Sequence, residues 1–188
     1  MIYLDHAATC PIRKPVWEAM ERRVGEADFN PASVHSPGGR AAAALEQARK
    51  EIATALGTAR SNLLFTGGGT QSDNLAVLGF ARATDRPARL LVSAVEHKAV
   101  LEAARRAESE GAIVEVLPVD STGWLDPQTL EERLTTATDY PTLVSVMWAN
   151  SEVGTVQPVQ DLCEIAHRHG ALFHTDAVQA CGKVPVSL

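Results

Sequence analysis

The chain is poor in aromatic residues and cysteines, and it has no long apolar run. Only 5% of its 188 residues are aromatic, and three are cysteines, with neither a C-x-x-C pair nor the spacing of zinc ligands. This scarcity fits a reducing compartment, and no metal site is expected. No segment approaches the roughly 20 apolar residues of a membrane-spanning helix, and the N-terminus lacks the features of a signal peptide. We therefore expect a cytoplasmic protein with no membrane partner.

Basic residues are in the minority. Seventeen Lys and Arg against 23 Asp and Glu, with His taken as neutral, give a net charge of −6. This is the wrong sign for a protein that binds nucleic acid, so none is expected as a partner, and any anionic ligand must be held locally. The 45% hydrophobic and 21% charged residues are typical of a globular protein. This composition excludes a disordered or fibrous chain and predicts a packed core.

The pattern of the chain changes near residue 60. Before it, apolar residues at helical spacing predict helices at 17–24 and 41–56. Between the helices, residues 30–39 contain two prolines and two glycines, which predict a loop. Gly57 is expected to end the second helix.

After residue 60, short apolar runs alternate with amphipathic ones. Strands are predicted at 63–65, 89–94, 112–117, 142–147 and 171–174, and helices at 70–83, 97–110, 127–134 and 159–169. Mostly unbroken apolar strands followed by helices or turns are typical of an α/β fold, with a mainly parallel sheet covered by helices on both faces. In such sheets ligands bind beyond the carboxyl ends of the strands. The residues that follow each strand are therefore the candidates for a site.

A glycine-rich segment follows the first predicted strand. Its sequence is Thr66-Gly67-Gly68-Gly69-Thr70, at the start of a predicted helix. The glycines let backbone N–H groups approach a ligand, and the helix offers its positive end. The segment lacks the Lys-Ser/Thr of a nucleotide P-loop and the third glycine of a dinucleotide fingerprint. It predicts an anion cradle, with phosphate favoured; a tight turn that needs a positive φ is the alternative.

Polar side chains follow the other predicted strands. His97 begins a helix, residues 148–154 form a polar cluster, and Asp176 and Gln179 follow the last strand. Singly, each has a simpler explanation: a lone histidine is more often structural, and turn chemistry accounts for the cluster. Together, an anion cradle, an imidazole, an amide or hydroxyl and a carboxylate suit an aromatic, phosphorylated cofactor with a basic ring nitrogen. Pyridoxal 5'-phosphate (PLP) has that chemistry.

At these residues the chain resembles the cysteine desulfurases of the iron–sulfur and nitrogen-fixation type, which are class V, fold-type I PLP enzymes. The motifs that carry the resemblance run through the whole chain in the family's order: Tyr3-Leu4-Asp5-His6-Ala7-Ala8-Thr9, Asn30-Pro31-Ala32-Ser33, Phe65-Thr66-Gly67-Gly68-Gly69-Thr70-Gln71-Ser72-Asp73-Asn74, Glu96-His97-Lys98-Ala99-Val100, Asn150-Ser151-Glu152-Val153-Gly154 and His174-Thr175-Asp176-Ala177-Val178-Gln179. The resemblance implies an incomplete PLP-transferase large domain. Residues 1–60 would be a helical arm with a substrate loop, and residues 61–188 a truncated cofactor-binding large domain.

The resemblance also implies which residues bind the cofactor. Gly69 and Thr70 would hold its phosphate, and His97 would stack on the pyridine ring and act as a catalytic residue in proton transfer. Asp176 would pair with the ring nitrogen, and Gln179 would donate a hydrogen bond to the phenolic oxygen. A carboxylate that keeps the pyridine protonated makes the ring an electron sink, so the implied roles agree with the chemistry.

Two further positions have implied roles. Asn30 would contact the substrate carboxylate. Ser151 stands where the family has a second asparagine that helps to bind the phenolic oxygen, so we expect the shorter hydroxyl to reach that oxygen only weakly or through water. The family's Schiff-base lysine, in a Ser-x-His-Lys motif, and its persulfide-forming cysteine would both lie beyond Leu188. The 188 residues alone are therefore expected to be inactive.

The resemblance implies the N-terminal part of a PLP-dependent cysteine desulfurase. The complete enzyme, a homodimer, would convert L-cysteine to L-alanine and pass the sulfur, as an enzyme-bound persulfide, to an acceptor or scaffold protein. That sulfur would serve iron–sulfur cluster or thio-cofactor biosynthesis. Two alternatives remain open: a selenocysteine lyase or another class V aminotransferase-like enzyme with the same cofactor site, and a non-catalytic fragment that needs a complementary chain.

Overall fold

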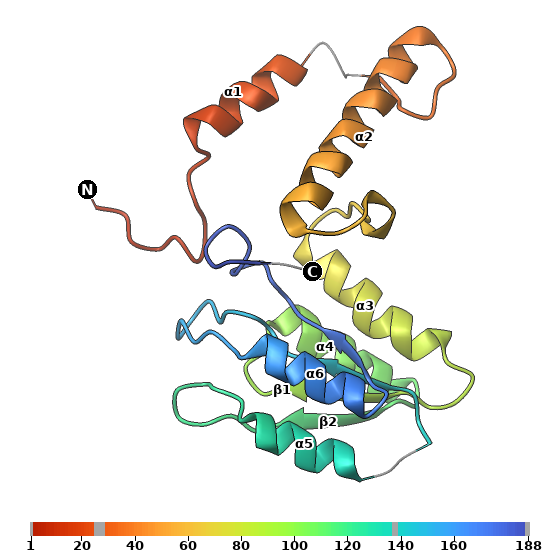
Figure 1. The fold of residues 1–188 in the computed structure, drawn as a ribbon, viewed down its shortest axis with the longest axis vertical. Coiled ribbons are helices and arrows are strands. Elements are labelled where there is room, and N and C mark those ends of the chain that lie inside the picture. Colours follow the sequence, from red (N-terminus) through yellow and green to blue (C-terminus); the bar gives the residue numbers. More distant parts are fainter. Residues whose placement is uncertain (1, 25–28, 137–138, 187–188) are drawn as a thin grey trace. The chain divides into compact units, whose positions relative to one another are not determined.

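The computed structural model describes residues 2–24, 29–136 and 139–186 (Figure 1). The chain divides into two compact units, Met1–Phe65 with Pro185–Leu188, and Thr66–Val184. The elements in chain order are α1 (Lys14–Arg23), α2 (Ser36–Leu56), the 3-10 turn η1 (Arg60–Asn62), α3 (Gly69–Ala83), β1 (Arg89–Ser93), α4 (Lys98–Ser109), β2 (Ile113–Leu117), α5 (Pro127–Thr135), β3 (Thr142–Ser145), α6 (Val159–Arg168) and β4 (Leu172–His174). Within the described ranges, no helix has both the length and the apolar character to cross a membrane.

The second unit is built on a four-stranded parallel sheet. Its strand order is β2-β1-β3-β4, and every neighbouring pair is parallel. In the register, Leu91 on β1 lies between Glu115 on β2 and Val144 on β3, and Val144 in turn pairs with Phe173 on β4. Parallel neighbours cannot be joined by hairpins, so the connections between them carry the helices. The predicted parallel α/β sheet is confirmed.

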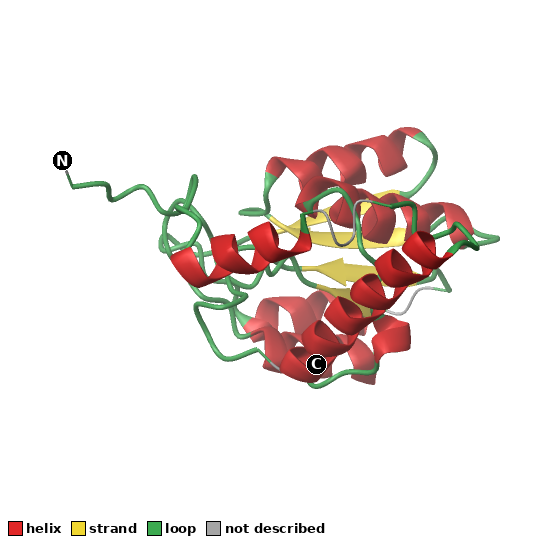
Figure 2. Cartoon of the chain, turned by 90° about the horizontal axis from the view of Figure 1, so that it is seen from above, coloured by secondary structure: helices red, strands yellow, loops and turns green. Residues whose placement is uncertain are grey.

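Helices cover both faces of this sheet (Figure 2). Because side chains alternate along a strand, Leu90 and Val92 pack with α3 and α4 on one face, whereas Leu91 packs on the other face with α5 and α6. The first core also contains Val77, Val100, Ala103, Ala104, Ala107 and Leu143; the second also contains Leu117, Leu125, Leu130, Leu134, Val144, Val146, Leu162, Ile165, Ala166 and Ala171. All five residues of β1 are buried, as a central strand requires.

One predicted strand is wrong: Leu63–Phe65 is not part of the sheet. Leu63 has extended backbone angles, but the segment pairs with no strand of the described chain. Instead, the Leu63 carbonyl oxygen accepts a hydrogen bond from Arg49 Nη1 at 2.6 Å, and the side chains of Leu64 and Phe65 are exposed. Three apolar residues do not specify a strand, because a strand also needs a neighbouring backbone with which to pair. The glycine-rich segment therefore follows an irregular stretch.

The first unit also differs from its prediction at helix starts. α2 begins at Ser36, so the predicted loop 30–39 ends at His35, whose Nδ1 accepts the Gly38 N–H at 3.1 Å. Proline is tolerated in a first helical turn, which is why Pro37 misled the loop prediction. Gly38 is buried, and a Cβ there would collide with Ser33, so this position accepts no larger residue.

The remaining helix ends agree more closely with the sequence pattern. α1 begins three residues before its prediction, with Pro15 in its first turn. Gly57 ends α2 with φ 71°, as predicted. Asp126 caps α5, since its Oδ1 accepts the Gln128 N–H at 2.9 Å. Every other predicted strand or helix agrees within two residues at each end.

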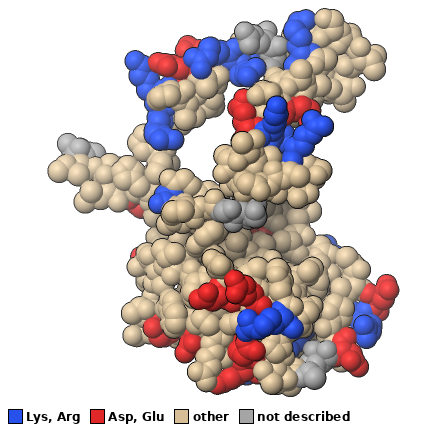
Figure 3. All heavy atoms as spheres, viewed as in Figure 1, with Lys and Arg blue, Asp and Glu red and all other residues tan. Residues whose placement is uncertain are grey.

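Charged side chains of both signs are interspersed over α5 and α6 (Figure 3). Glu131 on α5 accepts hydrogen bonds from Arg168 Nη2 at 2.6 Å and contacts His169 Nε2 at 2.7 Å. These exposed pairs each contribute at most about 1 kcal/mol, so they fix the position of α6 against α5 less strongly than the apolar core beneath them.

Candidate cofactor site

The carboxyl edge of the sheet gathers the polar segments of the second unit. β1 ends at Ser93, β3 at Ser145 and β4 at His174, and each is followed within a few residues by a motif singled out in the sequence. Because parallel strands end on the same edge, these motifs lie around one end of the sheet.

The glycine-rich segment forms a tight approach to α3. Gly68 has φ 150°, which L side chains rarely adopt. Gly69 and Thr70 are the first residues of α3, so their N–H groups have no carbonyl acceptor within the helix. The Gly67 N–H is already held by Gln71 Oε1 at 2.7 Å. The exposed helix start can therefore receive an anion on Gly69 and Thr70, as phosphate sites do.

The segment after β4 packs directly against this helix start. A Cβ on Gly69 would lie 3.0 Å from Val178 Cγ2, so the backbone approach depends on glycine. The Val178 N–H donates to Asp176 Oδ1 at 2.9 Å, and the Asp176 carbonyl accepts the Trp148 N–H at 2.9 Å. Asp176 is 9% exposed. The structure thus brings the predicted anion cradle and the predicted ring-nitrogen partner together.

Two further buried carboxylates, which the sequence analysis did not single out, accompany Asp176. Asp73 on α3 is 4% exposed and Glu96 is 6% exposed. Burial, and then the like charge of Asp176, raise the pKa of Asp73 to about 6, while the charge of His97 opposes the rise. Burial is also the main cause that raises the pKa of Glu96 to about 7. Burial and like charge therefore disfavour the ionised forms of these carboxyl groups, and a cationic ring beside them would favour ionisation.

The Asp73 side chain faces the end of β4. His174 Nε2 lies 3.8 Å from Asp73 Oδ1, and His174 Nδ1 is hydrogen-bonded to Ser145 Oγ at 2.9 Å. Burial lowers the pKa of His174, while the charge of Asp176 opposes that shift. His174 therefore offers little positive charge to the carboxylates near neutral pH, which leaves room for a cationic ligand.

His97 caps the start of α4. Its Nδ1 accepts the Ala99 N–H at 3.2 Å, and its side chain is exposed. Its charge opposes the rise in the pKa of Asp73 that burial causes. An exposed imidazole held by a cap hydrogen bond beside a carboxylate can stack on a flat ring and exchange protons.

The other predicted cofactor residues lie in or after turns. Ser151 is exposed in the turn after β3. The Oε1 atom of Gln179 accepts a hydrogen bond from Lys183 Nζ. Thr70 is exposed, and its carbonyl accepts Asn74 Nδ2–H at 2.8 Å.

Asn30, the predicted substrate contact, belongs to the first unit. Its Oδ1 accepts the Ala32 N–H at 2.9 Å, and its carbonyl oxygen accepts the Ser33 N–H at 3.0 Å. The amide therefore shapes the Asn-Pro-Ala-Ser turn that precedes α2. The three cysteines form no disulfide, and burial raises the pKa of the Cys163 thiol. A raised pKa makes this thiol a poor nucleophile.

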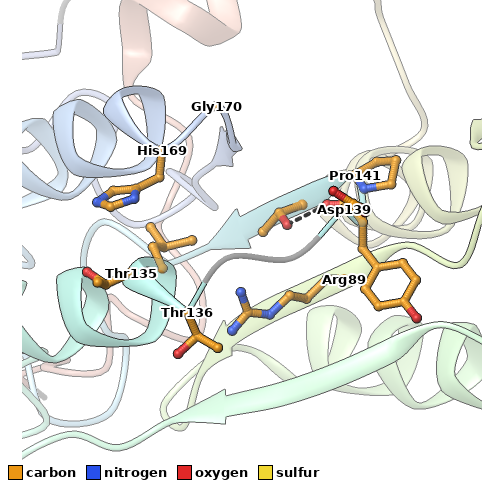
Figure 4. Close-up of a pocket in the computed structure, with 10 residues that line it drawn as sticks. Arg89, Thr135, Thr136, Asp139, Pro141, His169 and Gly170 are labelled. Carbon is orange, nitrogen blue, oxygen red and sulfur yellow. Dashed lines mark hydrogen bonds between the residues drawn. The ribbon is translucent and has the colours of Figure 1, made fainter.

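A cavity of about 380 Å³ lies at the opposite, amino-terminal edge of the sheet (Figure 4). The described residues that line it are Arg89, Leu134, Thr135, Thr136, Asp139, Tyr140, Pro141, Thr142, His169 and Gly170. The buried Arg89 guanidinium bonds Glu115 Oε1 at 2.7 Å and the Arg133 carbonyl at 3.0 Å. None of these lining residues belongs to the predicted site, and the charge of Arg89 is already balanced.

The residues at the carboxyl edge fit PLP. The start of α3 suits a phosphate dianion, and Gly69 leaves the space that a side chain would fill. The buried excess of carboxylate suits a pyridinium rather than a neutral or anionic ring. Asp73 and Glu96 were missed because their motifs show acidic residues but not their burial. The available signal was position: Asp73 is in the first turns of α3, and Glu96 directly precedes His97.

Comparison with known proteins shows the family of this chain. The model of the aminotransferase class-V family matches residues 2–188. The cysteine desulfurase IscS of Dictyoglomus turgidum is 43% identical over 188 residues, which cover all of this chain and 47% of the relative. The cysteine desulfurase NifS of Azotobacter vinelandii is 42% identical, with 46% of its length covered. The chain thus spans about half the length of the curated relatives it matches.

Solved structures show the same fold. A NifS-like protein superposes with a TM-score of 0.92 and 37% identity, covering all of this chain and 51% of that protein. A protein described as SspA in complex with cysteine superposes with a TM-score of 0.90 and 35% identity, covering 98% of this chain and 53% of that protein. The resemblance predicted from the motifs is confirmed: the chain belongs to the class-V aminotransferase family and is homologous to about half of a cysteine desulfurase, the N-terminal portion.

Proposed function

We propose that this chain is the N-terminal part of a PLP-dependent cysteine desulfurase. Family membership supports the reaction class, and the meeting of the glycine-rich helix start with the buried Asp176 supports the cofactor above all. The substrate would be L-cysteine, and one structural relative is described in complex with cysteine. The products would be L-alanine and a persulfide sulfur for an acceptor protein, in a cytoplasmic homodimer.

Each predicted residue has a chemical task in this proposal. The N–H groups of Gly69 and Thr70 bind phosphate, and the imidazole of His97 packs on the ring and holds a proton near the substrate. The Asp176 carboxylate keeps the ring nitrogen protonated, while Gln179, and more weakly Ser151, bind the phenolic oxygen. Bound there, PLP supplies an electron-withdrawing pyridinium that stabilises negative charge on the α-carbon of an amino acid. By the family resemblance, Asn30 contacts the substrate carboxylate.

The environment of Asp176 favours this task. Its Oδ1 is held by the Val178 N–H at 2.9 Å, which fixes the carboxylate without neutralising it. Burial first, and the like charge of Asp176 in addition, raise the pKa of Asp73 and of Glu96, so these two groups take up protons when no cation is near. The domain that binds the cofactor is proposed to be the second unit with its flanking residues, 61–188.

Binding of PLP by the purified chain tests the cofactor assignment. After incubation and desalting, the cofactor's visible absorbance should stay with the protein, and much less should stay with an Asp176→Asn variant. Activity is tested by co-expressing the C-terminal half of the Dictyoglomus turgidum relative. The pair should then form alanine from L-cysteine, and an added thiol reductant should release the persulfide sulfur as sulfide. A wild-type chain that retains no more PLP than the variant, in a pair that leaves cysteine unchanged, would refute the proposed function.

A further inference from the structure

Two turns at the carboxyl edge are tied together by reciprocal hydrogen bonds. The first turn, Ala94–His97, follows β1 and carries His97; the second, residues 148–154, follows β3 and carries Ser151. Glu96 reaches from the first turn to the residue that directly precedes the second, since its Oε1 accepts the Met147 N–H at 2.7 Å. Asn150 reaches back from the second turn, and its Nδ2 donates to the Val95 carbonyl at 3.0 Å. We call this pair of side chains the clamp.

Both ends of the clamp are held by further bonds. Glu96 Oε1 also accepts the Ser93 hydroxyl at 2.5 Å, so the side chain is fixed to the end of β1. Asn150 Oδ1 accepts the N–H groups of Glu152 and Val153 at 2.8 and 2.9 Å, so the amide also organises its own turn. Neither side chain is therefore free to swing, and the spacing between the two turns is set by short, directed bonds.

The clamp uses a buried acid where an uncharged side chain would cost less. Glu96 is 6% exposed, and its second oxygen, Oε2, has no hydrogen-bond partner among the described residues. A buried carboxyl group with an unpaired oxygen costs stability. The fold keeps this group nevertheless, which indicates that the hydrogen bond from the Met147 N–H to Glu96 Oε1 contributes to the structure. Adjacent to it in sequence is His97, the proposed ring-stacking residue.

We propose that Glu96 and Asn150 are positioning residues of the cofactor site: together they fix the distance between the turn that carries His97 and the turn that carries Ser151. The inference rests on the proposed function, because the spacing of His97 and Ser151 is important only when both residues face one cofactor ring. Groups that act on one bound molecule must be held to a fraction of an ångström, and rotamers locked by supporting hydrogen bonds provide that.

A matched set of variants isolates the clamp. Asn150→Asp keeps Oδ1 for the Glu152 and Val153 N–H groups but places an oxygen where Nδ2 donates to the Val95 carbonyl. Glu96→Gln keeps an acceptor for the Met147 N–H, whereas Glu96→Leu removes it. Gln128→Glu, an amide-to-acid change on the exposed start of α5, serves as the control.

The measurements are PLP affinity, the circular dichroism induced in bound PLP, and amide hydrogen exchange of the unloaded chain. Asn150→Asp should weaken PLP binding about tenfold and lose most of the induced dichroism, because the ring is no longer held in one orientation. Exchange should accelerate in both turns but not in the centres of β1 and β3. Glu96→Leu should behave like Asn150→Asp, and Glu96→Gln should recover most of the affinity and dichroism. Gln128→Glu should match the wild type.

The outcomes separate the clamp from the proposed function. If Asn150→Asp is folded and binds PLP with wild-type affinity and dichroism, the positioning role is wrong. Equal binding by the glutamine and leucine variants at residue 96 also overturns it. Should Glu96→Leu fail to fold, Asn150→Asp still decides. If the wild-type chain itself binds no PLP, the positioning role falls, whatever the exchange data show about the two turns; the proposed function falls with it only if the co-expressed pair also leaves cysteine unchanged.

Discussion

Gly69 and Val178 are in such close contact that a Cβ on Gly69 would lie 3.0 Å from the Val178 Cγ2 atom. The contact joins the start of α3 to the segment after β4, and the Val178 N–H in turn holds Asp176 at 2.9 Å. A small change at residue 69 is therefore transmitted to the buried carboxylate. We therefore expect a substitution at residue 69 to affect ligand binding more than folding.

Gly69→Ala is expected to weaken PLP binding about tenfold while changing the free energy of unfolding by less than about 1 kcal/mol. The added methyl group displaces Val178, whose exposed side chain can move, and with it the N–H that orients Asp176. Titration with PLP and urea unfolding measure the two effects. Val178→Ala in the same chain should restore much of the affinity by removing the contact.

The control for that change is Gly79→Ala on the same helix. Gly79 is exposed and a Cβ there would meet no atom within 4 Å. Alanine should stabilise the helix by roughly 0.5–1 kcal/mol and leave PLP affinity unchanged. If both alanine variants bind PLP equally well, the close approach of Gly69 has no part in ligand binding.

Asp176→Asn should lower PLP affinity by roughly tenfold to a hundredfold, because a charged hydrogen bond to the ring nitrogen is lost. Asparagine keeps an oxygen for the Val178 N–H, so the local backbone should persist. At pH 7 the free energy of unfolding should rise by up to about 1 kcal/mol, since the like charge that faces Asp73 and Glu96 disappears. PLP titration and urea unfolding of both proteins give the answer; unchanged affinity would contradict the assignment of this residue.

The buried Glu96 predicts a stability that falls as pH rises. Its pKa is raised from 4.5 to about 7 in the folded chain, so between these values the folded state binds more protons than the unfolded state. This contribution of Glu96 to the free energy of unfolding is fully present below about pH 4.5 and is lost by about pH 7. At about 1.4 kcal/mol per pKa unit, it totals up to roughly 3 kcal/mol. Asp73, whose pKa is raised to about 6, adds a change of the same sign.

The measurement is urea unfolding of the wild type and of Glu96→Gln at pH 4.5 and pH 7.5. Glutamine cannot ionise, so the variant should lose less stability over this range than the wild type. Glu108→Gln, at an exposed position on α4, should follow the wild type. Parallel pH profiles for the wild type and Glu96→Gln would mean that Glu96 is not a buried acid in solution.

Leu91→Ala should destabilise the second unit by about 2–5 kcal/mol, because its fully buried side chain lies in the middle of the central strand β1. Leu172→Ala, on the edge strand β4, should cost less than about 1 kcal/mol, since that side chain is 57% exposed. Both are measured by urea unfolding. Similar losses at the two positions would contradict the burial of Leu91 on the central strand and the exposure of Leu172 on the edge strand.

Local patterns predicted the elements that have a local cause. The four sheet strands and the helices that cover them follow from apolar runs and helical spacing, and Gly57 and Asp126 mark helix ends through their own backbone and side-chain chemistry. The prediction of a strand at Leu63–Phe65 failed because a strand needs a neighbouring backbone, and no described residue pairs with this segment. The start of α2 was placed late because Pro37 is compatible with both a loop and a first helical turn.

Of the candidate site, too, the sequence predicted one part and the tertiary structure was needed for the other. The sequence alone determined the order of the motifs, the α/β class, and the residue types that follow each strand, because these depend on neighbours along the chain. Only the tertiary structure decided that Gly69 meets Val178, that Asp73 and Glu96 are buried beside Asp176, and that Glu96 and Asn150 cross between two turns. Burial, pKa and contact depend on which distant segments the sheet brings together, and no local pattern records that.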